Sequence, residues 1–373
     1  MRNTVVAIPT LLLLCGLALG QEAGKVVHVY VSLDQEHSSG VLADFEKETG
    51  IKVEATFDTE ATKTIGLVRR LVAEKAAPKA DVYWNNELAT TIKLKEHGVL
   101  QRYVSPAAAD IPAAFKDPEG YWTGFAARAR VFIVNTDLVK PAEMPTSMWD
   151  LADPKWKGKT CMARPETGTT AAHAAALYVH DKARADEYFD KLIANDVTWL
   201  TGNAHCMREV SAGRFAFGWT DTDDFHVALL QGQPVAKVYP DKGTDELGVM
   251  YIPNSLVLIE GCRHPDAGKA LIDWLLRAEV EARLARSATA QIPVRPGVEV
   301  PEHVLRPDQV GKVFHVDWDR VGREYDSWVA HARERLAAAG TMSPLLLWIV
   351  GGLVVVSLGV VVFLRRATGD PSA

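Results

Sequence analysis

The sequence lacks the motifs of the common hydrolases and nucleotide-binding enzymes. It has no Gly-x-Ser-x-Gly nucleophile elbow, no His-Glu-x-x-His zinc motif and no P-loop. It also lacks an excess of positive charge, because 41 basic residues stand against 47 acidic ones, for a net charge of −6. A mildly acidic chain does not attract nucleic acid. These absences argue against an enzyme and against a nucleic-acid-binding protein.

Cysteine is also scarce. Of the four cysteines, Cys15 lies in the N-terminal segment, which leaves Cys161, Cys206 and Cys262. No two of them have the spacing of a metal site. An odd number leaves one thiol unpaired, and the sequence does not decide whether Cys161 and Cys206 form a disulfide.

The N-terminal end of the chain has an export signal, and the C-terminal end has a membrane-spanning signal. Residues 1–20 carry a basic start, an apolar core and a small-x-small end, which predicts a signal peptide cleaved before Gln21. Residues 345–364 form an uncharged apolar run long enough to span a bilayer. Arg365 and Arg366 follow at once and predict that the tail, 365–373, is cytoplasmic. We therefore expect an exported body that lies on the periplasmic side of the cytoplasmic membrane. A C-terminal transmembrane helix is expected to anchor it there.

The body alternates strand-like and helix-like segments, which predicts an α/β fold with largely parallel sheets. Its length of roughly 320 residues exceeds the usual size of one domain, so we expect two lobes. Extended segments at 130–135 and 249–257 are the predicted hinge. The expected boundaries are lobe 1 at 21–130, a hinge strand with lobe 2 at 131–250, and a return strand with the completion of lobe 1 and C-terminal helices at 251–340.

An apolar run at 215–219 is followed by three carboxylates, Asp221, Asp223 and Asp224. This pattern is typical of a buried strand that brings negative charge to its carboxyl end, where open α/β sheets bind ligands. Carboxylates packed this closely repel one another unless water or a cation lies between them. The alternative interpretation is a solvated acidic turn.

Several short segments, in their order along the chain, resemble the substrate-binding proteins of bacterial ABC importers, nearest the ferric-ion-binding type. They are Val29-Tyr30, 45–53 (FEKETGIKV), 80–84 (ADVYW), 128–131 (RARV), 153–159 (DPKWKGK) and 264–267 (HPDA). The resemblance implies the type II periplasmic-binding-protein fold, in which two α/β lobes close on a solute. It also implies an ABC permease and ATPase as partners and no catalytic cofactor.

The resemblance also implies where ligands bind. It places Asp34, with Glu36 close by, after the first strand, and Glu87 after a later one. Where ferric relatives have two adjacent tyrosines, this chain has Asp221-Thr222-Asp223, which argues against phenolate ligation. Carboxylate oxygens still suit ferric iron or a divalent cation. The alternative is that these acids cap helices and bind water.

Relatives hold an anion near the segment Gly168-Thr169-Thr170. A threonine-capped helix start offers free amides to an anion, although simple capping explains it equally well. Arg128 is expected to reach the same anion, or else to form an interlobe salt bridge. Trp84 and Trp219 are the aromatic candidates for the cleft wall.

The sequence thus predicts a tethered solute-binding protein that captures a metal ion with an anion. A small organic solute such as an aminophosphonate would use the same residues, with the acids on its ammonium group. Further alternatives are an anchored ligand sensor and a metal-assisted hydrolase. A neighbouring permease gene would favour import, and a neighbouring kinase gene would favour sensing.

Overall fold

The structure is a computed structural model that describes residues 26–33, 35–58, 65–166, 168–243 and 245–338. The predicted signal peptide (1–20), membrane span (345–364) and tail (365–373) lie outside these residues. Within the described ranges, every helix is too short or too polar to cross a bilayer.

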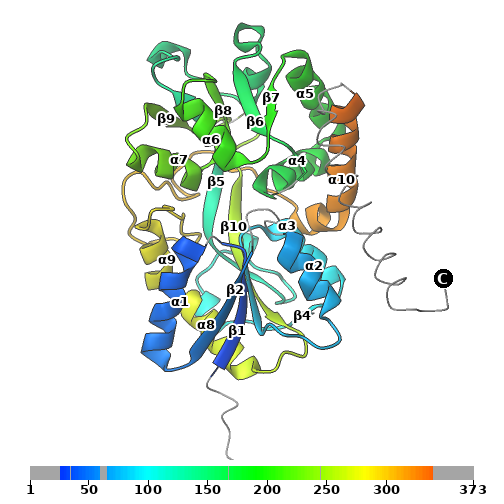
Figure 1. Ribbon diagram of the computed structural model, residues 1–373, viewed down its shortest axis with the longest axis vertical. Helices are drawn as coiled ribbons and strands as arrows, with labels where there is room; N and C mark the ends of the chain where they lie inside the picture. The colour runs from blue at the N-terminus through cyan, green and yellow to red at the C-terminus, as the bar shows by residue number, and fades with distance from the viewer. Residues whose placement is uncertain (1–25, 34, 59–64, 167, 244, 339–373) are drawn as a thin grey trace, which may run out of the picture.

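The chain forms two α/β lobes, drawn one above the other in Figure 1, as the sequence predicts. The lower lobe contains β1 (Val26–Val31), α1 (Gln35–Thr49), β2 (Lys52–Phe57), α2 (Ile65–Ala73), β3 (Val82–Asn85), α3 (Leu88–Glu96), β4 (Leu100–Gln101), α8 (Pro265–Leu275) and α9 (Ala278–Ala285). The upper lobe contains β6 (Thr160–Ala163), α4 (Gly168–His180), α5 (Lys182–Ala194), β7 (Thr198–Leu200), α6 (Asn203–Ser211), β8 (Phe217–Asp221), α7 (Thr222–Leu230) and β9 (Val235–Val238). Short 3-10 turns lie at 106–108, 113–115, 141–143, 148–152 and 154–156.

Two long strands join the lobes, β5 (Thr123–Asn135) and β10 (Tyr251–Ile259). The first half of β5 pairs with β10, and its second half, from Arg130 on, pairs with β8 and β9. Every residue of both strands is buried. The strand order is β2-β1-β3-β10-β5-β8-β6-β7. The strands next to the two connecting strands are therefore β3 of the lower lobe and β8 of the upper lobe.

Parallel pairing directs the strand ends of both lobes to their junction. The strands β1, β2 and β3 are parallel to one another, and so are β6, β7 and β8. The inner strands β3, β6 and β8 are buried along their whole length, as is typical of sheets that helices cover on both faces. Asn86 directly follows β3 and Asp221 ends β8, and Arg128 contacts both residues. The carboxyl edges of the two sheets therefore meet, which is the geometry of a ligand site in open α/β proteins.

The last described helix, α10 (Trp318–Ala338), packs against both lobes, on α3 and on α4. Lys93 of α3 forms an ion pair with Asp326 at 2.5 Å, and Arg335 reaches Asp190 of α5 at 2.7 Å. A Cβ atom on Gly322 would clash with the side chain of Ile92, so only glycine allows this close approach to α3. The helix therefore ties the upper lobe to the lower one beside the crossing strands (Figure 1).

The thiols of Cys161 and Cys206 lie side by side in the upper lobe, with their sulfur atoms 2.9 Å apart. Both are fully buried, and burial raises the pKa of Cys161 well above its usual value. Cys262 is only partly buried, and burial raises its pKa to about 11.

We expect a maleimide reagent to label Cys262 slowly in the native, reduced protein and to spare Cys161 and Cys206, because only thiolates that reach solvent react. Peptide mass spectrometry before and after unfolding in urea measures this. Fast labelling of Cys161 in the native protein would contradict the packing described.

Candidate functional site

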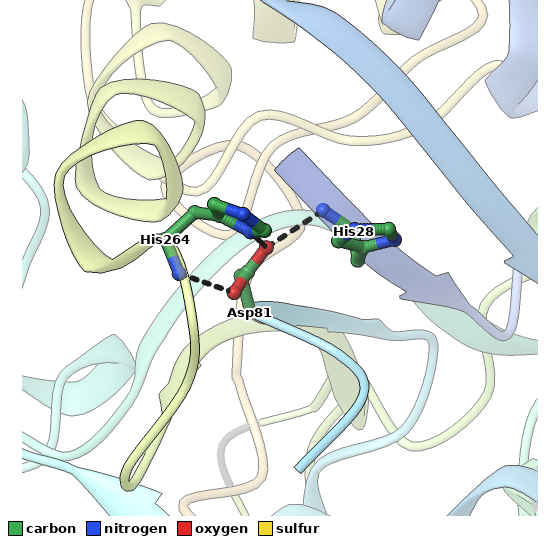
Figure 2. A group of neighbouring side chains, drawn as sticks. All are labelled: His28, Asp81 and His264. Carbon is green, nitrogen blue, oxygen red and sulfur yellow. Dashed lines mark hydrogen bonds and ion pairs between the residues drawn. The ribbon is translucent and has the colours of Figure 1, made fainter. Parts of the chain in front are cut away.

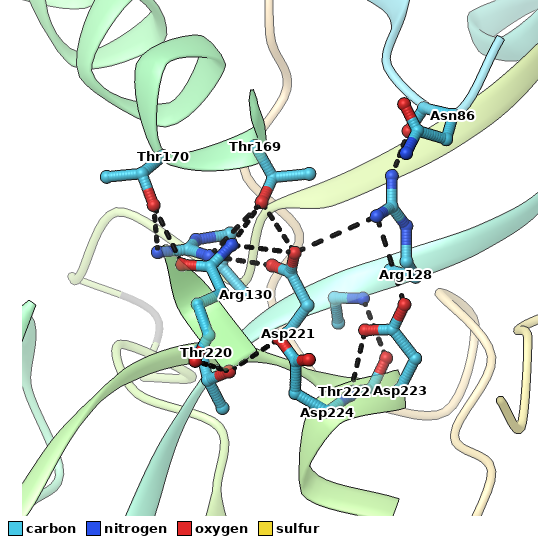
Figure 3. Close-up of polar contacts among 12 residues, drawn as sticks. Asn86, Arg128, Arg130, Thr169, Thr170, Thr220, Asp221, Thr222, Asp223 and Asp224 are labelled. Atoms are coloured by element: carbon cyan, nitrogen blue, oxygen red, sulfur yellow. Dashed lines mark hydrogen bonds and ion pairs between the residues drawn. The ribbon is translucent and has the colours of Figure 1, made fainter. Parts of the chain in front are cut away.

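The acidic cluster lies where β8 ends and α7 begins (Figure 3). Asp221 is the last residue of the strand and the first non-helical residue before α7, with extended backbone angles. Its side chain makes no capping hydrogen bond to α7, so the carboxylate is free for other partners. Asp223 and Asp224 fall in the first turn of the helix, where the helix dipole favours negative charge.

The principal partner of Asp221 is Arg130, which comes from the middle of β5. Nη1 of Arg130 lies 2.7 Å from Oδ1 of Asp221, and both side chains are almost entirely buried. An ion pair removed from water in this way is stable only when the remaining hydrogen-bonding groups are satisfied.

Two polar side chains of the upper lobe complete the coordination of Asp221. The hydroxyl of Thr169 donates to its Oδ2 at 2.5 Å, and the amide of Asn203 donates to the same oxygen at 3.1 Å. Asn203 also donates to the Thr169 hydroxyl at 2.6 Å and accepts from the Thr170 hydroxyl at 2.8 Å. Asp221 is therefore the centre of a buried polar network that joins β5, β8, α4 and α6.

Arg128 connects the network to the lower lobe. Its Nη2 donates to the main-chain oxygen of Asn86, which follows β3. Its Nη1 lies 3.8 Å from Asp221 and 3.9 Å from Asp223, too far for a hydrogen bond. The Nε–H groups of Arg128 and Arg130 are buried and have no hydrogen-bond partner among the described residues. Each of the two guanidinium groups beside the carboxylates therefore has one buried N–H donor without an acceptor among the described residues.

Asp223 and Asp224 differ in their surroundings. Oδ2 of Asp224 accepts a hydrogen bond from the Thr220 hydroxyl at 2.9 Å. The main-chain amide of Asp224 donates to Oδ1 of Asp223 at 3.0 Å. Burial, together with the Asp221 charge and against the pull of Arg128, raises the pKa of Asp223 to about 6. One oxygen from each of Asp221, Asp223 and Asp224 lies within 4.8 Å of the others, close enough to share one cation.

The segment predicted to hold an anion begins α4. Gly168 has a φ of +61°, a conformation that favours glycine, and Thr169 and Thr170 follow it into the helix. Arg130 lies 3.5 Å from the Thr169 hydroxyl and 3.4 Å from that of Thr170. The start of α4 therefore lies against both Arg130 and Asp221.

The tryptophans of the predicted cleft wall are buried. Trp84 is fully buried and packs on Phe125 in the apolar core of the lower lobe. The guanidinium of Arg130 lies 5.5 Å from the ring of Trp219, whose indole N–H donates to Tyr188 at 3.0 Å. The ring of Trp219 thus stabilises the buried guanidinium of Arg130 through a cation–π contact.

The remaining predicted ligands are Glu87, Glu36 and Asp34. Glu87 is buried and caps α3, accepting hydrogen bonds from the amides of Ala89 and Thr90 and from the Thr90 hydroxyl. Burial raises its pKa, against these hydrogen bonds. Glu36 belongs to α1, and Asp34 lies outside the described residues.

Two residues central to the network, Arg130 and Asn203, were not among the predicted site residues. Arg128 and Arg130 are two positions apart on a strand, so their side chains leave the same face, and this alternation is a signal that the sequence contains. Asn203 has no such signal, because only the fold brings the start of α6 to Asp221.

A separate cavity of about 260 Å³ lies in the upper lobe, between Trp149, Tyr188 and Asp241. None of its lining residues belongs to the acidic cluster or to the arginine pair. The cavity therefore adds nothing to the site described above.

Curated relatives include proteins named for iron uptake, for Fe(3+) binding and for putative binding of a phosphonate. The chain is 28% identical over 268 residues to the Fe(3+)-binding periplasmic protein of Serratia marcescens, covering 69% of this chain and 77% of that protein. It is 33% identical over 156 residues to iron uptake protein A1 of Synechocystis, covering 42% of each. It is 27% identical over 286 residues to a putative 2-aminoethylphosphonate-binding periplasmic protein of Salmonella typhimurium, covering 74% and 81%.

Solved structures share the fold. Apo ferric ion-binding protein A of Pasteurella haemolytica superposes with a TM-score of 0.74 at 21% identity, covering 86% of this chain and 99% of that one. The periplasmic binding protein AfuA of Actinobacillus pleuropneumoniae, with fructose-6-phosphate bound, gives 0.71 at 23% identity, covering 83% and 99%. The model of the bacterial extracellular solute-binding protein family matches residues 40–307. The chain therefore belongs to this family and is the extracytoplasmic solute-binding component of an ABC importer.

Proposed function

We propose that this protein captures a hard metal ion, ferric iron in the first place, together with a companion anion between its two lobes. Asp221, Asp223 and Asp224 would supply oxygen ligands to the ion, and Arg128, Arg130 and the start of α4 would hold the anion. An ABC permease and its ATPase would then receive the solute. No catalytic step is needed.

The main support for the proposal is that two buried guanidinium N–H groups without an acceptor and three carboxylates gather at the junction of the lobes. The buried Nε–H groups of Arg128 and Arg130 have no acceptor among the described residues, and each such group costs about 1–3 kcal/mol. An anion oxygen placed beside them would remove that cost. The Nη1 groups of the same two guanidiniums lie next to Asp221 and Asp223, which with Asp224 could share one cation.

Charge balance favours a cation that brings an anion with it. When all are ionised, the three carboxylates and the two arginines carry one net negative charge. A trivalent cation with a divalent anion, or a divalent cation with a monovalent anion, brings one net positive charge and neutralises the cluster. A bare anion would leave it more negative, at a high cost in a buried site.

A second candidate is a solute with an ammonium group and a phosphonate. It is favoured by the guanidinium of Arg128, which already lies between Asp221 and Asp223 and reduces the room for a metal ion. The similarity to the 2-aminoethylphosphonate-binding protein supports it as well. Asp223 would then accept the ammonium group, and Arg128 would hold the phosphonate bidentately.

Titration calorimetry with the full chain in detergent separates the two candidates. Ferric citrate, ferric ion with carbonate, and 2-aminoethylphosphonate are the solutes, and Arg128→Lys is the matched variant. We expect binding of ferric ion only with an anion, and about tenfold or more weaker binding by Arg128→Lys, because lysine cannot form the two parallel hydrogen bonds. Tight binding of 2-aminoethylphosphonate without metal would select the second candidate.

The predicted membrane helix at 345–364 leads to a separate expectation. A tether holds the protein near its permease and raises its effective concentration there. Removal of the chain from Leu345 onward should leave solute affinity unchanged and reduce uptake of radioactive iron by cells. Loss of affinity in the truncated protein would contradict a simple tether.

A further inference from the structure

A second group of metal-ligating side chains lies at the other end of the lower lobe. His28 of β1, Asp81 just before β3 and His264 just before α8 each place one ligand atom within 4.8 Å of the other two (Figure 2). The imidazole rings of the two histidines are 5.3 Å apart, centre to centre. The solute-binding function described above uses none of these residues.

Strand pairing and hydrogen bonds hold the three residues together without a metal. The amide of Asp81 donates to the carbonyl of His28 at 2.7 Å, which places Asp81 beside β1. The carboxylate of Asp81 in turn accepts from the amides of His28 and His264, both at 2.8 Å. The carboxylate of Asp81 is therefore held in place before an ion binds. Binding then costs little further conformational entropy of this side chain.

The donor distances suit a small tetrahedral ion. Nδ1 of His264 lies 3.0 Å from Oδ2 of Asp81. Ligands that are about 2.0–2.1 Å from a tetrahedral zinc ion lie about 3.3 Å from one another. The ion would replace the hydrogen bond between these two side chains, and the carboxylate would keep its two main-chain hydrogen bonds.

Glu54 supplies a second carboxylate next to this group. It pairs with His28 across β1 and β2, and its Oε2 lies 3.3 Å from Nδ1 of that histidine. Lys52 holds the other oxygen of Glu54 at 2.9 Å. A carboxylate against a ligating imidazole is a common second partner in zinc sites, because it fixes the ring.

We propose that His28, Asp81 and His264 form a binding site for a divalent transition metal of the zinc type, with Glu54 orienting His28. Two imidazoles with a carboxylate match Zn²⁺, whereas calcium prefers oxygen ligands alone. Side-chain exposures of 29% for His28 and 16% for His264 leave the site open to solvent. The ion would join β1, the start of β3 and the start of α8.

This site is distinct from the interlobe cluster. Asp81 precedes β3 and Asn86 follows it, so the two sites lie at opposite ends of one strand, about 16 Å apart along its length. Occupation of one site therefore does not require the other, and failure of the proposed solute function would leave this inference unaffected.

Zinc titration of the full chain against a chromogenic chelator tests the proposal. We expect one Zn²⁺ per chain, and His28→Ala and His264→Ala should each weaken binding at least about 100-fold, since even partners outside the ligand set change affinity 10–100-fold. His97→Ala, at an exposed site on the same lobe, and Asp223→Asn, in the interlobe cluster, should bind as the parent chain does. Co²⁺ should give the visible absorption of a tetrahedral site in the parent chain and in these two controls, and not in the histidine-site variants.

His28→Ala is the decisive variant because its side chain is partly exposed and its loss leaves the main-chain hydrogen bonds of Asp81 intact. Circular dichroism in the tryptophan region confirms that each variant is folded. Unchanged zinc affinity in folded His28→Ala would overturn the proposal. So would the loss of zinc binding in Asp223→Asn, which would assign the ion to the interlobe cluster.

Discussion

Replacement of Asp221 by alanine should lower the free energy of unfolding by about 3–5 kcal/mol, the loss expected when one partner of a buried ion pair is removed. Arg130 would remain buried with its charge uncompensated, since its exposed fraction is 1% and Asp221 is its nearest carboxylate at 2.7 Å. Thr169 and Asn203 would lose their common acceptor as well. Urea unfolding followed by tryptophan fluorescence measures the change.

Two companion variants separate the buried charge from the loss of volume. Asp190→Ala removes the acid of an exposed ion pair with Arg335 and should cost less than about 1 kcal/mol. The double change Asp221→Leu with Arg130→Met removes both charges and should recover much of the stability lost in Asp221→Ala. A double variant as unstable as Asp221→Ala would show that packing, not charge, explains the loss.

Replacement of Asp223 by asparagine should move stability and solute binding in opposite directions. The pKa of Asp223 is raised from its usual 3.8 to about 6, so the folded protein binds a proton that the unfolded chain releases. Stability therefore falls as pH rises from about 4 to about 6 and stays lower above that range. The asparagine side chain carries no charge, so the variant should be more stable at pH 8, by up to about 3 kcal/mol.

The same variant should bind ferric ion, the cation proposed for the interlobe cluster, at least about 30-fold more weakly, because a ligating charge in a buried site is worth about 2 kcal/mol or more. In the parent chain, affinity for the cation should fall as pH drops below about 6, where Asp223 takes up its proton. Thermal unfolding and calorimetry from pH 5 to pH 8 measure both effects. Equal stability of the two chains at pH 8 would contradict the raised pKa.

The α/β fold and its two lobes could be predicted because their signals are local. The apolar runs of β1, β3 and β8 and the helix starts between them follow from periodicity and composition. The position of Asp221 at the end of a buried strand could be predicted in the same way, since the strand runs directly into the acids.

The partners of these residues could not be predicted, because the chain separates them widely. Asp221 pairs with Arg130 from 91 positions away, and His264 meets Asp81 from 183 positions away. The role of Glu87 could not be predicted for a different reason, because its partners are close in sequence. Its position after β3 suits a ligand, but the amides of α3 begin two residues later and take its carboxylate as a cap.

The most direct test of the proposed metal site is an anomalous difference map at the iron edge, from crystals of the protein grown with ferric ion and citrate. We expect a peak between the lobes, bounded by oxygens of Asp221, Asp223 and Asp224, with the anion against Arg128 and the start of α4. A solute bound between the lobes without an iron peak, or iron held away from all three carboxylates, would contradict it.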